Sequence, residues 1–226
     1  MFIQANDTNL FYTKSGSGPA LLLLHGNGED HTIFDTLTSQ LQNHFTVYAL
    51  DTRGHGQSQP VPEYHYADMT EDAAAFINQL QLAPLTVIGF SDGGIIALLL
   101  AMQHPALVKG IVACGTNYNP RGLKARYRFL FGFLYLFNRD AKIKMMFNEP
   151  DITLQQLKNI AAPTLFLAGQ RDMISAKHTR TLAGAVPGSQ LTVLKGETHS
   201  SYVVNSPKLY KEIFAFLNQL YTSFFT

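Results

Sequence analysis

The segment Gly89-Phe90-Ser91-Asp92-Gly93 places a serine between two glycines, at the junction of two apolar runs. The run before it has the length of a buried strand, and the run after it is apolar nearly all round, which is typical of a buried helix. In a strand-to-helix turn of this kind the central residue is strained, and flanking glycines avoid collisions with neighbouring backbone. We therefore predict that Ser91 is a nucleophile, rather than an incidental serine in a tight turn.

A serine hydroxyl is a poor nucleophile at neutral pH, so this prediction requires a general base and a group that orients the base. Asp172 and His199 each follow a predicted strand, in the segments AGQRD and GETH. Serine, aspartate and histidine in this order match a triad assembled along one edge of a parallel sheet. Taken alone, Asp172 would be interpreted as a helix cap and His199 as a surface residue. Together with Ser91 they predict chemistry through an acyl enzyme, formed from an ester, thioester or activated amide.

Such a reaction also needs two amide donors for a negatively charged oxygen. The glycine-rich turn His25-Gly26-Asn27-Gly28 follows a strand, and it predicts the backbone N–H of Asn27 as one donor, to within one position. The alternative is a simple strand-to-helix turn. The N–H of Asp92 is the predicted second donor. The Asp92 carboxylate would favour cationic esters if it faced the pocket; otherwise it caps the turn or points away.

The elements that must position these residues alternate between short apolar runs and helical patterns. This alternation predicts an α/β fold with an eight-stranded, mostly parallel sheet and helices on both faces. Asp68 and Glu71, at capping-box spacing, predict the start of one helix. The predicted strands are residues 1–5, 9–14, 20–25, 46–50, 85–90, 108–114, 163–169 and 190–195.

The stretch from residue 117 to about residue 160 departs from this alternation, since it is aromatic, basic and predicted to be helical. We interpret it as an insertion between two strands of a single domain, residues 1–226. Phe129, Phe133 and Phe137 are predicted to line a substrate pocket. Seven of the seventeen Lys and Arg residues lie between Arg121 and Lys144. Their charges are either solvated on a packed helix, or they attract anionic substrates or a membrane surface.

The composition limits the classes of partner. The chain is 46% hydrophobic and 15% charged with a formal net charge of +1, which favours neither nucleic acid nor membrane as a partner. We see no signal peptide and no apolar run near the length of a membrane span, so we expect a cytoplasmic location and no stable membrane insertion. The only cysteine, Cys114, excludes an internal disulfide and is predicted to be a buried apolar residue.

We expect no metal and no cofactor, because the histidines lack ligand spacing and serine-based acyl chemistry needs none. The expected partner is a small-molecule ester. The sequence does not indicate an oligomeric state.

Several segments resemble the α/β-hydrolase fold superfamily, and they occur in family order along nearly the whole chain: His25-Gly26, DTRGHGQS at 51–58, GFSDGG at 89–94, AGQRD and GETH. The resemblance implies that Ser91 is the nucleophile, His199 the base and Asp172 the orienting acid. It implies that Asn27 and Asp92 supply the oxyanion amides. It also implies structural roles for Arg53 and His55, and a short cap made by the insertion.

The function that the resemblance implies is a serine hydrolase acting on small carboxylic esters or thioesters. Haloalkane dehalogenases and epoxide hydrolases of this superfamily use aspartate in place of Ser91 and are therefore disfavoured. One alternative is a ligand receptor with slow or no turnover. Acyl transfer to an acceptor other than water is another. A carbon–carbon bond hydrolase is a minor one, because such relatives usually have a larger lid and often a tryptophan, which this chain lacks.

Overall fold

Eight strands form one sheet in the order β1-β2-β4-β3-β5-β6-β7-β8. The computed structural model describes residues 1–222. β1 pairs with β2, and β2 with β4, in antiparallel fashion, and all other neighbours are parallel. The strands are β1 Phe2–Ala5, β2 Thr8–Ser15, β3 Ala20–Leu24, β4 Thr46–Leu50, β5 Leu85–Phe90, β6 Val108–Cys114, β7 Thr164–Gly169 and β8 Gln190–Leu194. The predicted eight-stranded, mostly parallel sheet is confirmed.

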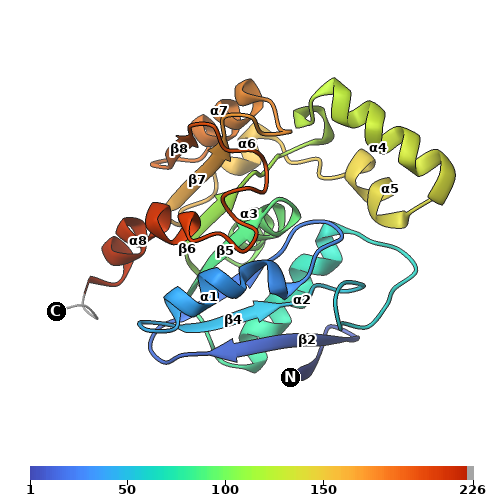
Figure 1. The fold of residues 1–226 in the computed structure, drawn as a ribbon. Helices are drawn as coiled ribbons and strands as arrows, with labels where there is room; N and C mark the ends of the chain where they lie inside the picture. Colours follow the sequence, from blue (N-terminus) through green and yellow to red (C-terminus); the bar gives the residue numbers. More distant parts are fainter. Residues whose placement is uncertain (223–226) are drawn as a thin grey trace.

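Helices cover both faces of this sheet (Figure 1). In β3, Leu21 and Leu23 pack in a buried cluster with α1 and α8, whereas Leu22 and Leu24 pack in a second cluster with α2, α3, α6 and α7. Successive strand side chains point to opposite faces, so four consecutive leucines serve two cores. The helices are α1 Asp35–Leu41, α2 Tyr66–Gln79, α3 Asp92–Gln103, α4 Ala125–Asn138, α5 Ala141–Asn148, α6 Leu154–Leu157, α7 Ala176–Ala185 and α8 Lys208–Leu220.

Helix α2 begins earlier than the sequence predicted. Its first residue is Tyr66, and its N-cap His65 makes no capping hydrogen bond through its side chain. The amide of Tyr66 instead donates to a carboxylate oxygen of Glu149, at 3.0 Å. Asp68 lies within the helix and pairs with Arg53, at 3.3 Å. The predicted start is wrong because a residue distant in sequence takes the place of a local cap.

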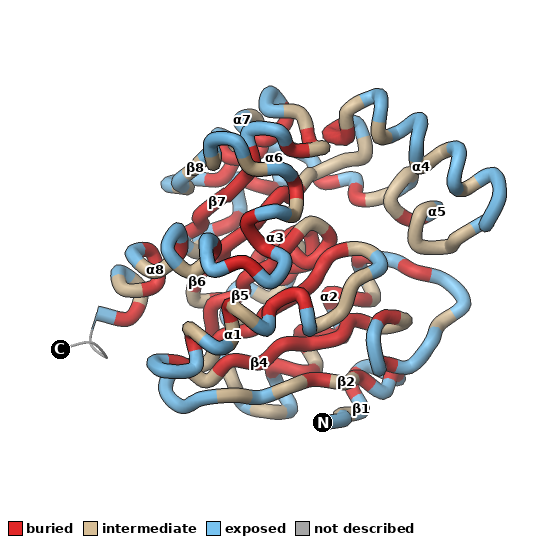
Figure 2. The backbone as a smooth tube through the Cα atoms, viewed as in Figure 1, coloured by how far each residue is buried: buried red, intermediate tan, exposed pale blue. Residues whose placement is uncertain are grey.

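The segment between β6 and β7 contains α4, α5 and α6. Helix α4 projects from the body of the molecule, and none of its residues is buried (Figures 1 and 2). Cys114, at the end of β6, is buried, and burial raises the pKa of its thiol. In residues 1–222 no helix combines the length and apolar character needed to cross a membrane.

Two glycines in helices provide a matched test of the packing between β3 and α3. A Cβ added to Gly93 would overlap the backbone carbonyl of Leu24, whereas a Cβ on Gly184 would meet open space. We expect Gly93→Ala to lower the free energy of unfolding by about 2 kcal/mol or more, because backbone must move. Gly184→Ala should raise it by roughly 0.5 kcal/mol, since alanine loses less entropy on folding. Urea denaturation measures both; equal changes would contradict this account.

Candidate active site

Ser91 sits in a strained turn between β5 and α3. Its φ is +52° and its ψ is −111°, a conformation that residues other than glycine rarely adopt. Its N–H donates to the carbonyl of Cys114 at 2.7 Å, and its carbonyl accepts from Gly94 N–H at 3.0 Å. A Cβ on Gly89 would overlap the backbone of Gly93, so the glycine spacing permits the close packing of strand and helix. The turn holds Ser91 at the N-terminus of α3.

The structure brings the three predicted residues into one chain of hydrogen bonds. Ser91 Oγ lies 3.2 Å from His199 Nε2, and His199 Nδ1 lies 2.7 Å from Asp172 Oδ1. With the proton on Nδ1, His199 donates to Asp172 and leaves Nε2 free to accept from the serine hydroxyl. The three residues come from different strand ends, as the sequence predicted, because parallel strands present their carboxyl ends at one edge.

The Asp172 carboxylate is held in its charged form. Burial alone would raise its pKa, but the hydrogen bond and charge of His199 and the backbone amides lower it, and the net pKa lies below its ordinary value. Oδ1 accepts the N–H of Ile174 at 2.9 Å. Lys124 donates from Nζ to the backbone carbonyl of Asp172. Asp172 therefore suits the task of fixing the orientation of His199.

Gly115 makes room for His199 and was not singled out from the sequence. It follows β6 with a φ of +61°, and a Cβ there would lie 2.8 Å from His199 Cε1. The ring of Phe90 also packs against the imidazole, with a centroid distance of 4.9 Å. A lone glycine after a strand carries no sequence signal of this role, because its partner lies 84 positions away along the chain.

Two predicted amide donors lie beside Ser91. Within residues 1–222, the backbone N–H groups of Asn27 and Asp92 have no hydrogen-bond acceptor. The loop that carries Asn27 is joined to α3, since Asn27 Nδ2 donates to Asp92 Oδ2 at 3.0 Å. Free amides at a helix N-terminus are suited to an oxygen that gains negative charge.

The Asp92 carboxylate is bound by side chains of the protein. It is 7% exposed and accepts hydrogen bonds from the side chains of Asn27 and Tyr66. Burial raises its pKa, and these hydrogen bonds offset part of that effect. It does not line the cavity at Ser91, so the alternative in which it attracts cationic esters is not supported.

Arg53 and His55 support the loop after β4. Arg53 donates from Nε and Nη2 to the Asp72 carboxylate, both at 2.6 Å. His55 Nδ1 lies 3.1 Å from Thr52 Oγ1, and Thr52 N–H donates to His25 Nε2 at 3.0 Å. Burial lowers the pKa of His25, and it lowers that of His55 to about 4. Both imidazoles are thus neutral at pH 7, and neither lines the cavity at Ser91.

A cavity of about 210 Å³ opens beside Ser91 and His199. Its walls are mostly apolar, with one carboxylate, Glu29. Glu29 accepts the N–H of Gly26 at 3.0 Å, and burial raises its pKa. Glu29 was not predicted from the sequence, and its only signal there is its position three residues after Gly26. The lining residues are Gly26, Asn27, Glu29, Phe90, Ser91, Phe131, Ile143, Met146, Met173, His199 and Ser200.

The predicted pocket residues Phe129, Phe133 and Phe137 lie elsewhere. They are 78%, 52% and 76% exposed and do not line the cavity at Ser91, which takes Phe131 from the same helix. Residues four apart share one face of a helix, so the three predicted residues turn together to solvent while Phe131 turns inward. The pocket assignment is therefore corrected. The spacing identified the shared face of α4, but not the direction in which it points.

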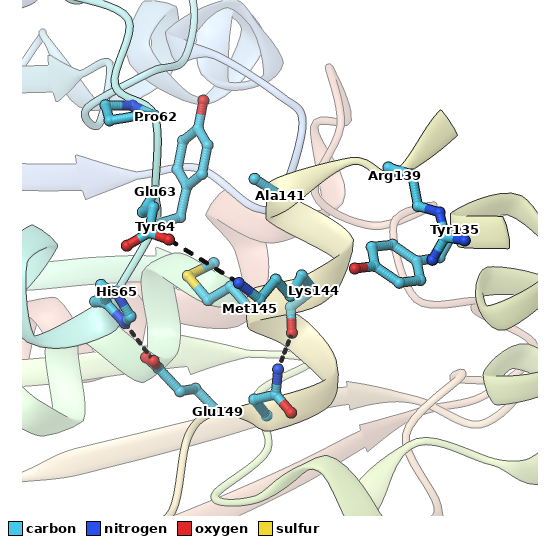
Figure 3. A pocket seen from close by; sticks show the side chains of 11 residues that line it. Pro62, Glu63, Tyr64, His65, Tyr135, Arg139, Ala141, Lys144, Met145 and Glu149 are labelled. Atoms are coloured by element: carbon cyan, nitrogen blue, oxygen red, sulfur yellow. Dashed lines mark hydrogen bonds and ion pairs between the residues drawn. The ribbon is translucent and has the colours of Figure 1, made fainter. Parts of the chain in front are cut away.

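A second, larger cavity of about 320 Å³ lies between the loop before α2 and helices α4 and α5 (Figure 3). Charged pairs cross it: His65 Nδ1 lies 2.6 Å from a Glu149 carboxylate oxygen, and Lys144 Nζ lies 4.0 Å from one of Glu63. It contains neither Ser91 nor His199. These pairs attach α5 to the start of α2. We therefore interpret the second cavity as part of the contact between residues 117–160 and the body of the protein.

Asp30, His31 and Asp51 place potential metal ligands within 4.8 Å of one another. Their atoms are already used by the protein. Asp51 Oδ1 accepts from the N–H of His31 and lies 2.7 Å from its Nδ1, while Asp30 caps Thr32 at 2.9 Å. This cluster is explained by loop structure.

The chain is similar to known hydrolases. A profile of the alpha/beta hydrolase fold matches residues 19–142. The chain is 28% identical to the serine hydrolase BPHL of Mus musculus, over 89% of this chain and 80% of that protein. It is 37% identical to a pimeloyl-[acyl-carrier protein] methyl ester esterase of Chromobacterium violaceum, over 48% of this chain and 41% of the esterase. The chain spans only 29% to 41% of the length of several curated relatives that it matches, this esterase among them.

Solved structures agree on the fold. The enol-lactonase from Burkholderia xenovorans LB400 superposes with a TM-score of 0.80 at 22% identity, covering 96% of this chain and 100% of the lactonase. At this identity the likeness concerns the fold.

The pair of His65 and Glu149 predicts a pH-dependent contribution to stability. The hydrogen bond to Glu149 raises the pKa of His65 above its ordinary value of 6.5. The contribution is therefore fully present below pH 6.5 and is lost as the pH rises through the raised pKa. We expect His65→Gln to lower Tm most near pH 5.5, where His65 is charged and pairs with Glu149. The effect should be smallest near pH 9, where His65 is neutral. In a Glu149→Gln background the pH dependence should be much smaller, and a His65→Gln effect that varied with pH as strongly as in the native chain would contradict this.

Proposed function

The chain belongs to the alpha/beta hydrolase family, and on that premise we propose that it is a serine hydrolase that cleaves small carboxylic esters or thioesters through an acyl enzyme. The observation that carries the proposal is the hydrogen-bonded chain from Ser91 through His199 to Asp172, on a strained turn beside two free amides. The names of the mouse serine hydrolase and the bacterial methyl ester esterase support the same reaction class.

In the proposed mechanism, Ser91 Oγ attacks the substrate carbonyl while His199 Nε2 accepts the hydroxyl proton. Asp172 fixes the imidazole and stabilises its charge after the transfer. The amides of Asn27 and Asp92 stabilise the oxyanion, aided by the N-terminus of α3. His199 then donates its proton to the leaving group, and it later activates the water that releases the acid. Asp172 thus stabilises the positive charge on His199, and the two amides stabilise the negative charge on the oxyanion.

The cavity supports a substrate of modest size with an apolar portion. Phe131, Ile143 and Met146 come from α4 and α5, so in this proposal residues 117–160 act as a short cap on a single domain, residues 1–226. The volume of about 210 Å³ suits a short acyl chain or a small ring better than a long chain. Glu29 is the one ionisable wall group besides His199 and faces the reacting centre from the Gly26 loop.

Turnover of a series of p-nitrophenyl esters, from acetyl to long acyl chains, tests the reaction class. We expect multiple turnovers, and Ser91→Ala should reduce kcat by roughly 10⁴-fold or more. Ser200→Ala is the matched control, since Ser200 lines the same cavity without a hydrogen bond to His199. Absence of turnover across the series, or equal effects of the two variants, would refute the ester hydrolase. Labelling of Ser91 by a fluorophosphonate without turnover would indicate a slow receptor.

The position of Phe131 in the cavity at Ser91 leads to a second test of the proposed function. Phe131→Ala should enlarge the cavity and shift the acyl-chain optimum of kcat/KM to longer chains, by roughly two or more carbons. Phe129→Ala lies on the same helix with its side chain in solvent, so the optimum should not move. A shift caused by Phe129→Ala and not by Phe131→Ala would restore the original assignment.

A further inference from the structure

Helix α4 turns a row of large apolar side chains toward solvent. Of the eleven exposed large apolar residues among residues 1–222, six lie on this helix. Three are the phenylalanines Phe129, Phe133 and Phe137, at 78%, 52% and 76% exposure, and Leu136 is 63% exposed. Figure 2 shows α4 without a buried residue along its length. A contiguous exposed apolar face of this kind marks an interaction site.

This face is separate from the proposed substrate cavity. Phe131 lines the cavity, and Tyr135 lines the second cavity below the helix. The exposed phenylalanines share one face because they are four residues apart. They lie two positions from Phe131 and Tyr135, and residues two apart in a helix point in nearly opposite directions. Helix α4 therefore separates the cavity from whatever occupies its outer face. The outer face has no part in the chemistry proposed above.

Four arginines lie on α4 or next to its ends. Arg121, Arg126, Arg128 and Arg139 are exposed, and in the described part of the chain none forms an ion pair with a carboxylate. Arg126 and Arg139 stack on the rings of Tyr127 and Tyr135. These contacts leave the positive charges uncompensated.

The other basic residues of the segment are engaged elsewhere. Lys124 donates to the Asp172 carbonyl, Lys142 lies 4.7 Å from the centroid of the Tyr64 ring, and Lys144 approaches Glu63. The only acid between Arg121 and Lys144, Asp140, caps α5 by accepting from Lys142 N–H at 2.8 Å. In the described part of the chain, the unpaired positive charge of this segment is thus carried by these four arginines.

We propose that the outer face of α4 docks on an anionic membrane surface. Phenylalanine and leucine side chains would enter the boundary between headgroups and acyl chains, and the arginines would contact anionic headgroups. With 14 residues the helix is shorter than the roughly 20 needed to span a bilayer, so it would lie in the plane of the interface. A second copy of the chain fits less well, because it would bring two sets of unpaired arginines together.

Docking has a consequence for the proposed function. The helix that contacts the lipid also contributes Phe131 to the cavity, so an ester dissolved in the membrane would reach Ser91 past a single helix. This consequence rests on the proposed serine hydrolase. Docking itself does not, and vesicle binding measures it without any turnover.

Co-sedimentation with vesicles of phosphatidylcholine, with and without about 30% phosphatidylglycerol, tests the proposal. The chain should bind the anionic vesicles, and binding should weaken in high salt. The triple variant Phe129→Ser, Phe133→Ser, Phe137→Ser should bind at least about tenfold more weakly. Changing the four arginines to glutamine should weaken the affinity for anionic vesicles by roughly fivefold for each charge removed. The matched control changes Leu154, Val193 and Val204 to serine, which are exposed on other elements and should leave binding intact.

Two results would overturn the proposal. The first is no binding to anionic vesicles, or binding that survives the phenylalanine variant. The second is self-association, seen by sedimentation velocity, that the phenylalanine variant abolishes while vesicles bind neither protein. Far-UV circular dichroism verifies that both variants fold, independently of any turnover. A chain that binds vesicles but hydrolyses no ester would refute the proposed function and leave docking standing.

Discussion

The close packing of β5, α3 and β3 around Ser91 is the constraint on which the site depends. A non-glycine residue at φ +52° costs of order 1–3 kcal/mol. This cost is offset by the burial of the sheet on both faces. It is also offset by the hydrogen bonds of Ser91 to the carbonyl of Cys114 and to the N–H of Gly94 in α3. Gly93 lies against the carbonyl of Leu24, so the turn and the neighbouring strand are locked together. The serine hydroxyl consequently has a fixed position, and His199 and Asp172 are placed relative to it.

Those groups reach the serine because parallel strands end at one edge of the sheet. Asp172 follows β7 and His199 follows β8. The two side chains bond to each other, and the backbone N–H of Ile174 also holds the Asp172 carboxylate. Small residues are needed wherever backbone or ring must approach, as at Gly115 beside the imidazole. The buried carboxylates differ in their partners. His199 and amides stabilise the charge of Asp172, whereas burial dominates at Asp92 and Glu29 and raises their pKa.

The segment between β6 and β7 has two sides with different chemistry. Its inner side supplies apolar walls to the cavity at Ser91, and pairs such as His65 with Glu149 attach it to α2. Its outer side is apolar, and four arginines on α4 or next to its ends form no ion pair within residues 1–222. Because one helix carries both sides, whatever binds outside is one helix away from the cavity within.

The sequence by itself determined the strands, the order of Ser91, Asp172 and His199, and the glycine spacing at the turn, because each depends on residues adjacent in the chain or on the direction of parallel strands. The tertiary structure decided which face of α4 looks inward, since periodicity defines a face but not its orientation. It also decided the start of α2, where Glu149 replaces a local cap across 83 positions. The positions of Glu29 in the cavity and of Asp92 against Asn27 and Tyr66 were set in the same way. Contacts between residues far apart in sequence leave no local pattern from which to predict them.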